Sequence, residues 1–132
     1  MDSFQLKPST YLIGDPGLIF KKIEGRTLTD HLWKKFYQNP KKFHEMNIDG
    51  ITFYITKTKE GDGYFEGVGT DSGTIMIMDL NAYQHDPRIQ MLSDRKGILT
   101  LDITKEVTVM VDNHILMFKL DNHILYQIRM FD

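Results

Sequence analysis

Three glycine-rich segments place a carboxylate where a strand is expected to end. They are GDPG at residues 14–17, GDGYFEG at 61–67 and GTDSGTIMIMD at 69–79. Glycine lets a ligand or another backbone come close, and the neighbouring aspartate presents an acid to it. The segments together nominate one candidate ligand-binding constellation, made of Gly14, Asp15, Asp62, Gly69, Asp71, Ser72 and Gly73.

The same residue types are typical of turns that bind nothing. Asp15, Pro16 and Gly17 suit a β-turn, and Asp62 with the glycine after it is a strong hairpin pair. If the turns are neighbours, the carboxylates of Asp15 and Asp71 repel each other. Backbone amides or a lysine would relieve that repulsion structurally, whereas a divalent cation or a cationic group of a partner would relieve it functionally.

Three enzymatic motifs are incomplete in this chain. GVGTDSG approaches a dinucleotide fingerprint but leads into a predicted strand, where no helix N-terminus can hold a pyrophosphate. The DSG around Asp71 has the form of an aspartic-protease loop, and a single copy would need a homodimer. No motif places a histidine beside Ser72. The sequence therefore predicts no catalytic residue and favours a protein that is not an enzyme.

The sequence DNHIL occurs twice near the C-terminus, at residues 112–116 and 121–125. His114 and His123 flank one predicted strand, so about eight residues at ~3.3 Å each separate them. Ligands of one metal ion must converge within a few ångströms. We therefore interpret the repeat as one hairpin turn used twice, because Asp and Asn tolerate the positive φ angles of tight turns.

Composition excludes several classes of protein. The 132-residue chain suits one domain, 1–132, and no signal or membrane-spanning segment stands out, which predicts a cytoplasmic protein. The absence of cysteine excludes disulfides and thiolate metal sites. A net charge of −2 argues against general nucleic-acid binding. WKKFYQNPKKF, at residues 33–43, mixes cations with aromatics as single-strand binders do, although helical spacing explains the aromatics as core.

Hydrophobic periodicity predicts a strand-rich chain with one main helix. Leu28, Leu32 and Phe36 form the stripe of an amphipathic helix over 28–39, and a shorter helix is expected at 88–94. Strands are expected at 11–13, 18–20, 51–57, 64–69, 74–80, 97–103, 107–111, 115–120 and 124–131.

The last four strands predict an antiparallel meander. If the second DNH turn uses residues 121–123, Leu116 and Phe118 share an apolar face with Ile124, Tyr126, Ile128 and Met130. A second sheet or the helix over 28–39 would cover that face. The fold class is thus α+β and β-dominated, with antiparallel sheets, a C-terminal four-strand meander and one main amphipathic helix.

The ordered set LIGDPG and GDGYFEGVGTDSGTIMIMDL is similar to a diffuse group of short uncharacterised proteins of bacteria and phages. The similarity covers about a quarter of the chain. That group usually continues with cysteine or an aromatic residue after the proline, where this chain has Gly17 and Leu18. The resemblance implies that Asp15, Asp62 and Asp71 form one constellation, and that the protein has a bacterial or viral origin.

The function that the sequence favours is that of a small non-enzymatic binding or interaction protein, with an inhibitor-like or host-takeover accessory role implied by the resemblance. Its expected partner is a protein or a small ligand, and no cofactor is expected unless a divalent cation binds. The alternative is a metal-dependent hydrolase or nucleotide binder that uses Asp15, Asp62 and Asp71.

Overall fold

Two antiparallel sheets and a helix form the layers of the protein. The structure is a computed structural model and describes residues 2–21, 28–90 and 97–131. The strands are β1 Ser3–Leu6, β2 Ser9–Gly14, β3 Phe43–Ile48, β4 Ile51–Lys57, β5 Gly63–Phe65, β6 Val68–Thr70, β7 Thr74–Asp79, β8 Leu99–Ile103, β9 Val107–Asp112, β10 Ile115–Leu120 and β11 His123–Arg129. The helices are α1 Pro16–Ile19, α2 Thr29–Gln38 and α3 Leu80–Tyr83.

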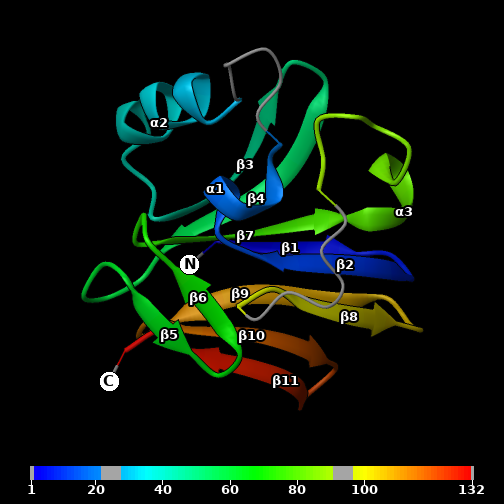
Figure 1. Ribbon diagram of the computed structural model, residues 1–132. Helices are drawn as coiled ribbons and strands as arrows, with labels where there is room; N and C mark the ends of the chain where they lie inside the picture. The colour runs from blue at the N-terminus through cyan, green and yellow to red at the C-terminus, as the bar shows by residue number, and fades with distance from the viewer. Residues whose placement is uncertain (1, 22–27, 91–96, 132) are drawn as a thin grey trace.

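The strands divide into a five-stranded sheet, a four-stranded sheet and a small hairpin. The five-stranded sheet has the order β3-β4-β7-β2-β8, the four-stranded sheet has the order β1-β9-β10-β11, and β5 pairs with β6. Figure 1 shows α2 beside β3 and β4 at the top and β9 to β11 at the bottom. The expected fold class, β-dominated α+β with four consecutive C-terminal strands, is confirmed. Within that run, β8 pairs with β2, so the chain crosses from one sheet to the other between β8 and β9.

The strand β7 lies at the centre of both hydrophobic cores. Ile75 and Ile77 pack toward the four-stranded sheet, and Met76 and Met78 pack toward the helical side. All four side chains are at most 1% exposed. Alternate residues of a strand point to opposite faces, so a strand covered on both faces reads as the continuous apolar run TIMIM.

The second sheet covers the apolar face of the C-terminal strands. Val107, Val109, Leu116 and Phe118 share one core with β2 and β7 of the five-stranded sheet. The predicted helix is also confirmed, and its stripe of Leu32 and Phe36 is buried against the opposite face of that sheet. Of the two elements that the sequence offered to cover the C-terminal strands, the sheet does so and the helix forms the outer layer.

Three local expectations differ from the structure. Leu18 and Ile19 lie in the short helix α1, because Asp15 caps it and Pro16 fixes its first residue, so the predicted strand at 18–20 is wrong. The single strand predicted at 64–69 is a hairpin of two short strands. Residues 88–90 are not helical, and the rest of the helix expected at 88–94 falls outside the described residues.

Both DNH segments form hairpin turns, but the expectation that one turn is used twice is wrong, because the two turns use different positions of the repeat. Asn113 and His114 are the two turn residues between β9 and β10, with φ of 50° and 61°. The second turn consists of Asp121 and Asn122, and His123 already belongs to β11. A bulge at Leu125 then restores the alternation, since Phe118 pairs with Tyr126 and Lys119 with Ile124. Tyr126, Ile128 and Met130 therefore join the apolar face as expected, whereas Ile124 is 49% exposed.

A side chain from another turn blocks part of the outer edge of β11, in addition to the bulge at Leu125. The carboxylate of Glu66, in the turn between β5 and β6, accepts a hydrogen bond from the backbone N–H of Arg129 at 2.7 Å. The C-terminal end of this outer strand is thus already bonded within the molecule. Among the described residues, no helix combines the length and the apolar character that crossing a membrane requires.

The two histidines of the repeat give opposite expectations for stability. His114→Gly relieves left-handed strain of about 1 to 2 kcal/mol against about 0.5 to 1 kcal/mol of backbone entropy, so we expect a small net gain. His123→Gly places glycine in an extended strand and we expect a loss of about 0.5 to 1 kcal/mol. Urea unfolding of both variants measures the difference. A loss of stability in His114→Gly as large as that in His123→Gly would contradict this account of the turn.

Candidate functional site

Asp15 is a buried carboxylate at the junction of β2 and α1. Its side chain is 2% exposed, and Oδ1 accepts a hydrogen bond from the N–H of Gly17 at 2.7 Å. The local sequence explains this position, because an aspartate before proline is a preferred N-cap and proline suits the first helical residue.

The second oxygen of Asp15 reaches a distant segment of the chain. Oδ2 accepts hydrogen bonds from the hydroxyl of Thr70 at 2.8 Å, the N–H of Asp71 at 2.7 Å and the N–H of Ser72 at 3.1 Å. The GDPG and GTDSG segments are therefore neighbours, as the constellation requires. Backbone amides and one hydroxyl surround the Asp15 carboxylate, which is the structural way of stabilising its charge that the sequence left open.

Hydroxyl groups extend this network beneath the turn. Thr70 gives its only hydroxyl hydrogen to Asp15, so its oxygen accepts from the N–H groups of Ser72 and Thr74 at 3.3 and 3.2 Å. The Ser72 hydroxyl lies 2.7 Å from the Thr74 hydroxyl. Ser72 is thus hydrogen-bonded to a threonine, and the described structure gives it no histidine partner.

Glycines bring the third turn against the other two. Gly73 has φ of 73°, and a Cβ there would lie 3.0 Å from the Cα of Gly61. Thr58 ties the same turns together, since its N–H donates to the carbonyl of Gly73 and its hydroxyl to that of Gly61. Asp62 follows this contact and is exposed. Gly14 packs closely, because a Cβ there would lie 3.3 Å from the Ile98 side chain, a tight contact.

A hollow of about 310 Å³ opens beside the three turns. Gly69 lies in its wall, where a Cβ would come within 3.4 Å of the Tyr64 ring and 3.6 Å of the Gly97 backbone. The Tyr64 side chain is 54% exposed, and Asp71 is exposed as well. The lining residues are Leu18, Gly63, Tyr64, Gly69, Thr70, Asp71 and Gly97. Sequence reasoning missed Tyr64, Thr70 and Gly97, although the aromatic residue next to Gly63 was a signal for the first.

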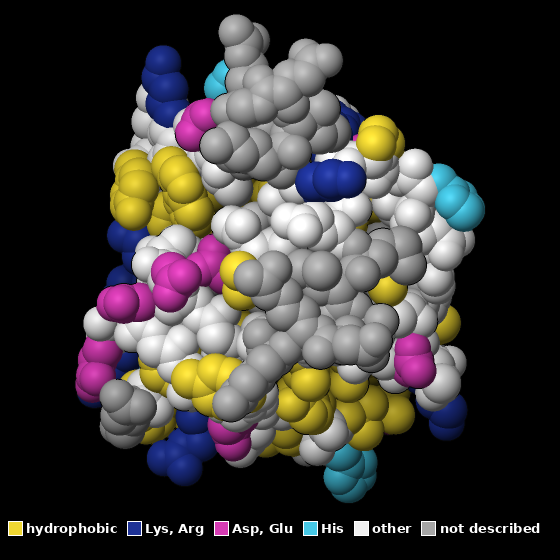
Figure 2. All heavy atoms as spheres, in the orientation of Figure 1, with side chains coloured by type: hydrophobic (Ala, Val, Ile, Leu, Met, Phe, Trp, Pro, Cys, Tyr) yellow, Lys and Arg dark blue, Asp and Glu magenta, His cyan; other side chains and the backbone are white. Residues whose placement is uncertain are grey.

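The described residues of the turns at 60–72, which form one side of this hollow, carry only negative charges. Every charged residue between positions 60 and 72 is a carboxylate, and Glu60, Asp62, Glu66 and Asp71 are all exposed. Figure 2 shows acidic side chains gathered on one side of the face it presents. We call Glu60, Asp62, Tyr64 and Asp71 the acidic turn surface.

The proposed metal ligands do not gather around one point. Among the described residues, no three histidine, aspartate or glutamate side chains could together hold an ion. Asp15 is surrounded by donors. A further carboxylate that could have joined a cation site, Asp79, instead accepts from the Ser9 hydroxyl at 2.6 Å and from the N–H of Ala82 at 3.3 Å. The two repeat histidines lie at opposite ends of β10.

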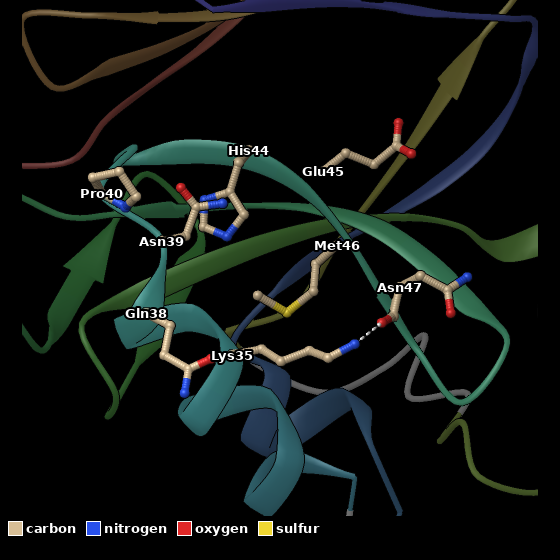
Figure 3. A pocket seen from close by; sticks show the side chains of 8 residues that line it. All are labelled: Lys35, Gln38, Asn39, Pro40, His44, Glu45, Met46 and Asn47. Carbon is tan, nitrogen blue, oxygen red and sulfur yellow. Dashed lines mark hydrogen bonds between the residues drawn. The ribbon is translucent and has the colours of Figure 1, made fainter.

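A second hollow, of about 440 Å³, lies between the end of α2 and β3 (Figure 3). His44 lines it and is only 5% exposed. The ring stacks on Phe36 at 5.4 Å between centroids, and Nδ1 lies 3.1 Å from the carbonyl of Lys41. Burial lowers the pKa of His44, and its hydrogen bond to the Lys41 carbonyl opposes this shift only in part. The ring is therefore neutral near pH 7.

Comparisons of the chain with protein-family models, curated proteins and solved structures give no match.

Replacing Asp15 tests the network directly. Asp15→Asn turns an NH₂ group toward backbone N–H donors and removes the charge they stabilise, so we expect a loss of about 2 to 4 kcal/mol in the free energy of unfolding. Asp71→Asn is the matched control, because the same change on an exposed side chain should shift stability by less than about 0.5 kcal/mol. Chemical denaturation compares the two. Equal effects would show that burial of Asp15 does not contribute as described.

Burial of His44 predicts a loss of stability in acid. The unfolded chain takes up a proton near the ordinary histidine pKa of about 6.5, whereas the folded chain resists it until lower pH. The contribution of neutral His44 to the free energy of unfolding is thus complete above about pH 6.5. As the pH drops below that value, this contribution decreases by at most about 1.4 kcal/mol per pH unit.

Unfolding free energies of the wild type, His44→Gln and His85→Gln between neutral and mildly acidic pH test this expectation. His85 is exposed, so the control should keep the wild-type slope, whereas His44→Gln should flatten it. A slope unchanged in His44→Gln would refute the assignment.

Proposed function

We propose that the protein is a small non-enzymatic binding protein whose acidic turn surface takes a basic segment of a protein partner. The hollow that joins the exposed Tyr64 ring to the exposed Asp71 carboxylate carries this proposal. An ammonium or guanidinium group finds there both an aromatic face and an opposite charge, with glycine backbone leaving room for its approach.

Charge and hydrophobic contact both favour such a partner. Asp62 and Glu60 extend the negative potential beyond the hollow, which attracts cations and repels phosphate. Leu18 adds an apolar wall against which the methylene stem of a lysine can pack. A side chain with an apolar stem and a positive end therefore fits the hollow better than a bare inorganic cation.

The network beneath the site supports binding by holding its groups in place. Asp15 accepts from the backbone of Asp71, and Gly69 donates to the carbonyl of Gly97 at 2.9 Å. The segment that carries Asp71 is thus fixed before a partner arrives, which reduces the ordering entropy of association. In the inhibitor-like role that the resemblance implies, this surface would occupy a cationic site of its target.

Binding rather than catalysis agrees with the chemistry of the polar groups. The Ser72 hydroxyl bonds to threonine hydroxyls and the Asp15 carboxylate to amides, so neither is placed with a base or a substrate-facing proton. The function therefore rests on recognition, with Asp71 and Tyr64 as the two groups that would contact the partner.

A labelled lysine–glycine peptide tests the proposal by fluorescence anisotropy. We expect saturable binding that weakens as salt rises. Asp71→Asn and Tyr64→Ala should each weaken it roughly three- to tenfold, as the loss of a partly desolvated cation contact implies. A glutamate–glycine peptide should not bind.

Asp121→Asn provides the matched control. It removes the same charge from another exposed turn, and asparagine tolerates the positive φ of 53° at that position. Its affinity for the lysine peptide should equal that of the wild type. Absence of lysine-peptide binding, or equal weakening in Asp71→Asn and Asp121→Asn, would refute the proposed surface.

A further inference from the structure

The hollow between α2 and β3 contains a buried polar atom whose hydrogen bonding is incomplete. His44 Nε2 is inaccessible and has no hydrogen-bond partner among the described residues. A buried acceptor left in that state costs about 1 to 3 kcal/mol, so native proteins rarely keep one without a use. The acidic turn surface shares no residue with this hollow.

The hydrogen bond at the other ring nitrogen assigns the chemistry of Nε2. The Lys41 carbonyl can only accept, so the 3.1 Å contact places the ring hydrogen on Nδ1. Nε2 of the neutral ring therefore presents a lone pair. A ligand that satisfies it must bring an O–H or N–H donor.

The side chains around the hollow select the rest of the ligand. Lys35 Nζ donates to the Asn47 carbonyl at 3.3 Å and keeps further hydrogens for a second acceptor. Glu45 also belongs to the lining of the hollow, but Figure 3 shows its side chain directed away from α2, on the opposite side of β3 from His44 and Met46. The charge that Lys35 brings to this hollow thus favours an anion.

Access to Nε2 depends on long side chains. Lys35, Gln38 and Met46 line the hollow next to His44, and each changes rotamer at low cost compared with backbone movement. The volume of about 440 Å³ falls within the range of small-molecule sites. A small ligand can therefore enter by displacing side-chain ends while the strand and helix stay in place.

We propose that this hollow is a binding site for a small hydroxylated anion, which donates an O–H to His44 Nε2 and places its negative group against Lys35. Polyol phosphates and hydroxycarboxylates share this chemistry, because both carry a hydroxyl and an anionic group. Binding at this site is independent of the acidic turn surface.

Nitrogen-15 NMR of the histidine rings tests the site, because the Nε2 resonance moves upfield when its lone pair accepts a hydrogen bond. The probes are glycerol 3-phosphate, glycerate, glycerol and inorganic phosphate, each titrated into the full chain. We expect glycerol 3-phosphate or glycerate to shift His44 Nε2 saturably, and the one that binds more tightly identifies the anionic group. Glycerol and phosphate alone should bind at least tenfold more weakly.

Variants separate binding from the packing role of the ring. Lys35→Met keeps the apolar stem and should lower the affinity for the probe that binds about tenfold. Lys105→Met, which changes an exposed lysine outside the hollow, should leave that affinity unchanged. His44→Phe preserves the stack on Phe36 and should abolish probe binding, with circular dichroism confirming the fold. An Nε2 signal that none of the probes moves, or a shift unchanged in Lys35→Met, would overturn the proposal and leave His44 as a packing residue.

Discussion

The buried carboxylate of Asp15 is the constraint on which the arrangement of this protein depends. One oxygen caps the N-terminus of α1, and the other accepts hydrogen bonds from the segment between β6 and β7. A buried charge is stable only while its hydrogen-bond donors are present. Burial of the Asp15 carboxylate therefore requires the start of α1 and the segment between β6 and β7 to lie together. The position of Leu18, the course of the Asp71 turn and the shape of the hollow between them all follow from this one group.

Local pattern was sufficient for the elements whose cause is local. The stripe of Leu32 and Phe36 predicted α2, the run TIMIM predicted β7, and the repeated DNH segments predicted where the two C-terminal turns lie, although only the second turn is an Asp–Asn pair. Long-range causes were out of reach. The donors to Asp15 Oδ2 lie at least 55 residues away. The Asp15–Pro16 pair is a local signal for α1, but it suits a β-turn as well as a helix N-cap and did not decide between them.

Some features of the candidate site likewise have local causes that the sequence reveals, and others depend on long-range contacts. The glycine–aspartate turns were recognisable because these residues favour turns, whereas the proximity of Asp15 and Asp71 was only a condition when judged from the residues and was otherwise implied by the resemblance. Which carboxylate would be buried and which exposed depended on the Thr70 hydroxyl and on backbone direction, and neither has a sequence signature. His44 gave no signal at all, since no strand was predicted at residues 43–48, and a strand pattern would not have shown whether the second nitrogen of the ring has a partner.

The outer edge of the four-stranded sheet limits how this molecule can meet copies of itself. β11 exposes Ile124 and Leu125, an apolar pair that would invite another chain to extend the sheet. The bulge at Leu125 interrupts the regular spacing of its outward amides, and the Glu66 carboxylate already holds the amide of Arg129. Neither half of the strand offers an unbroken template, so two molecules cannot extend this sheet through β11 without first breaking the hydrogen bond of Glu66 or accommodating the bulge.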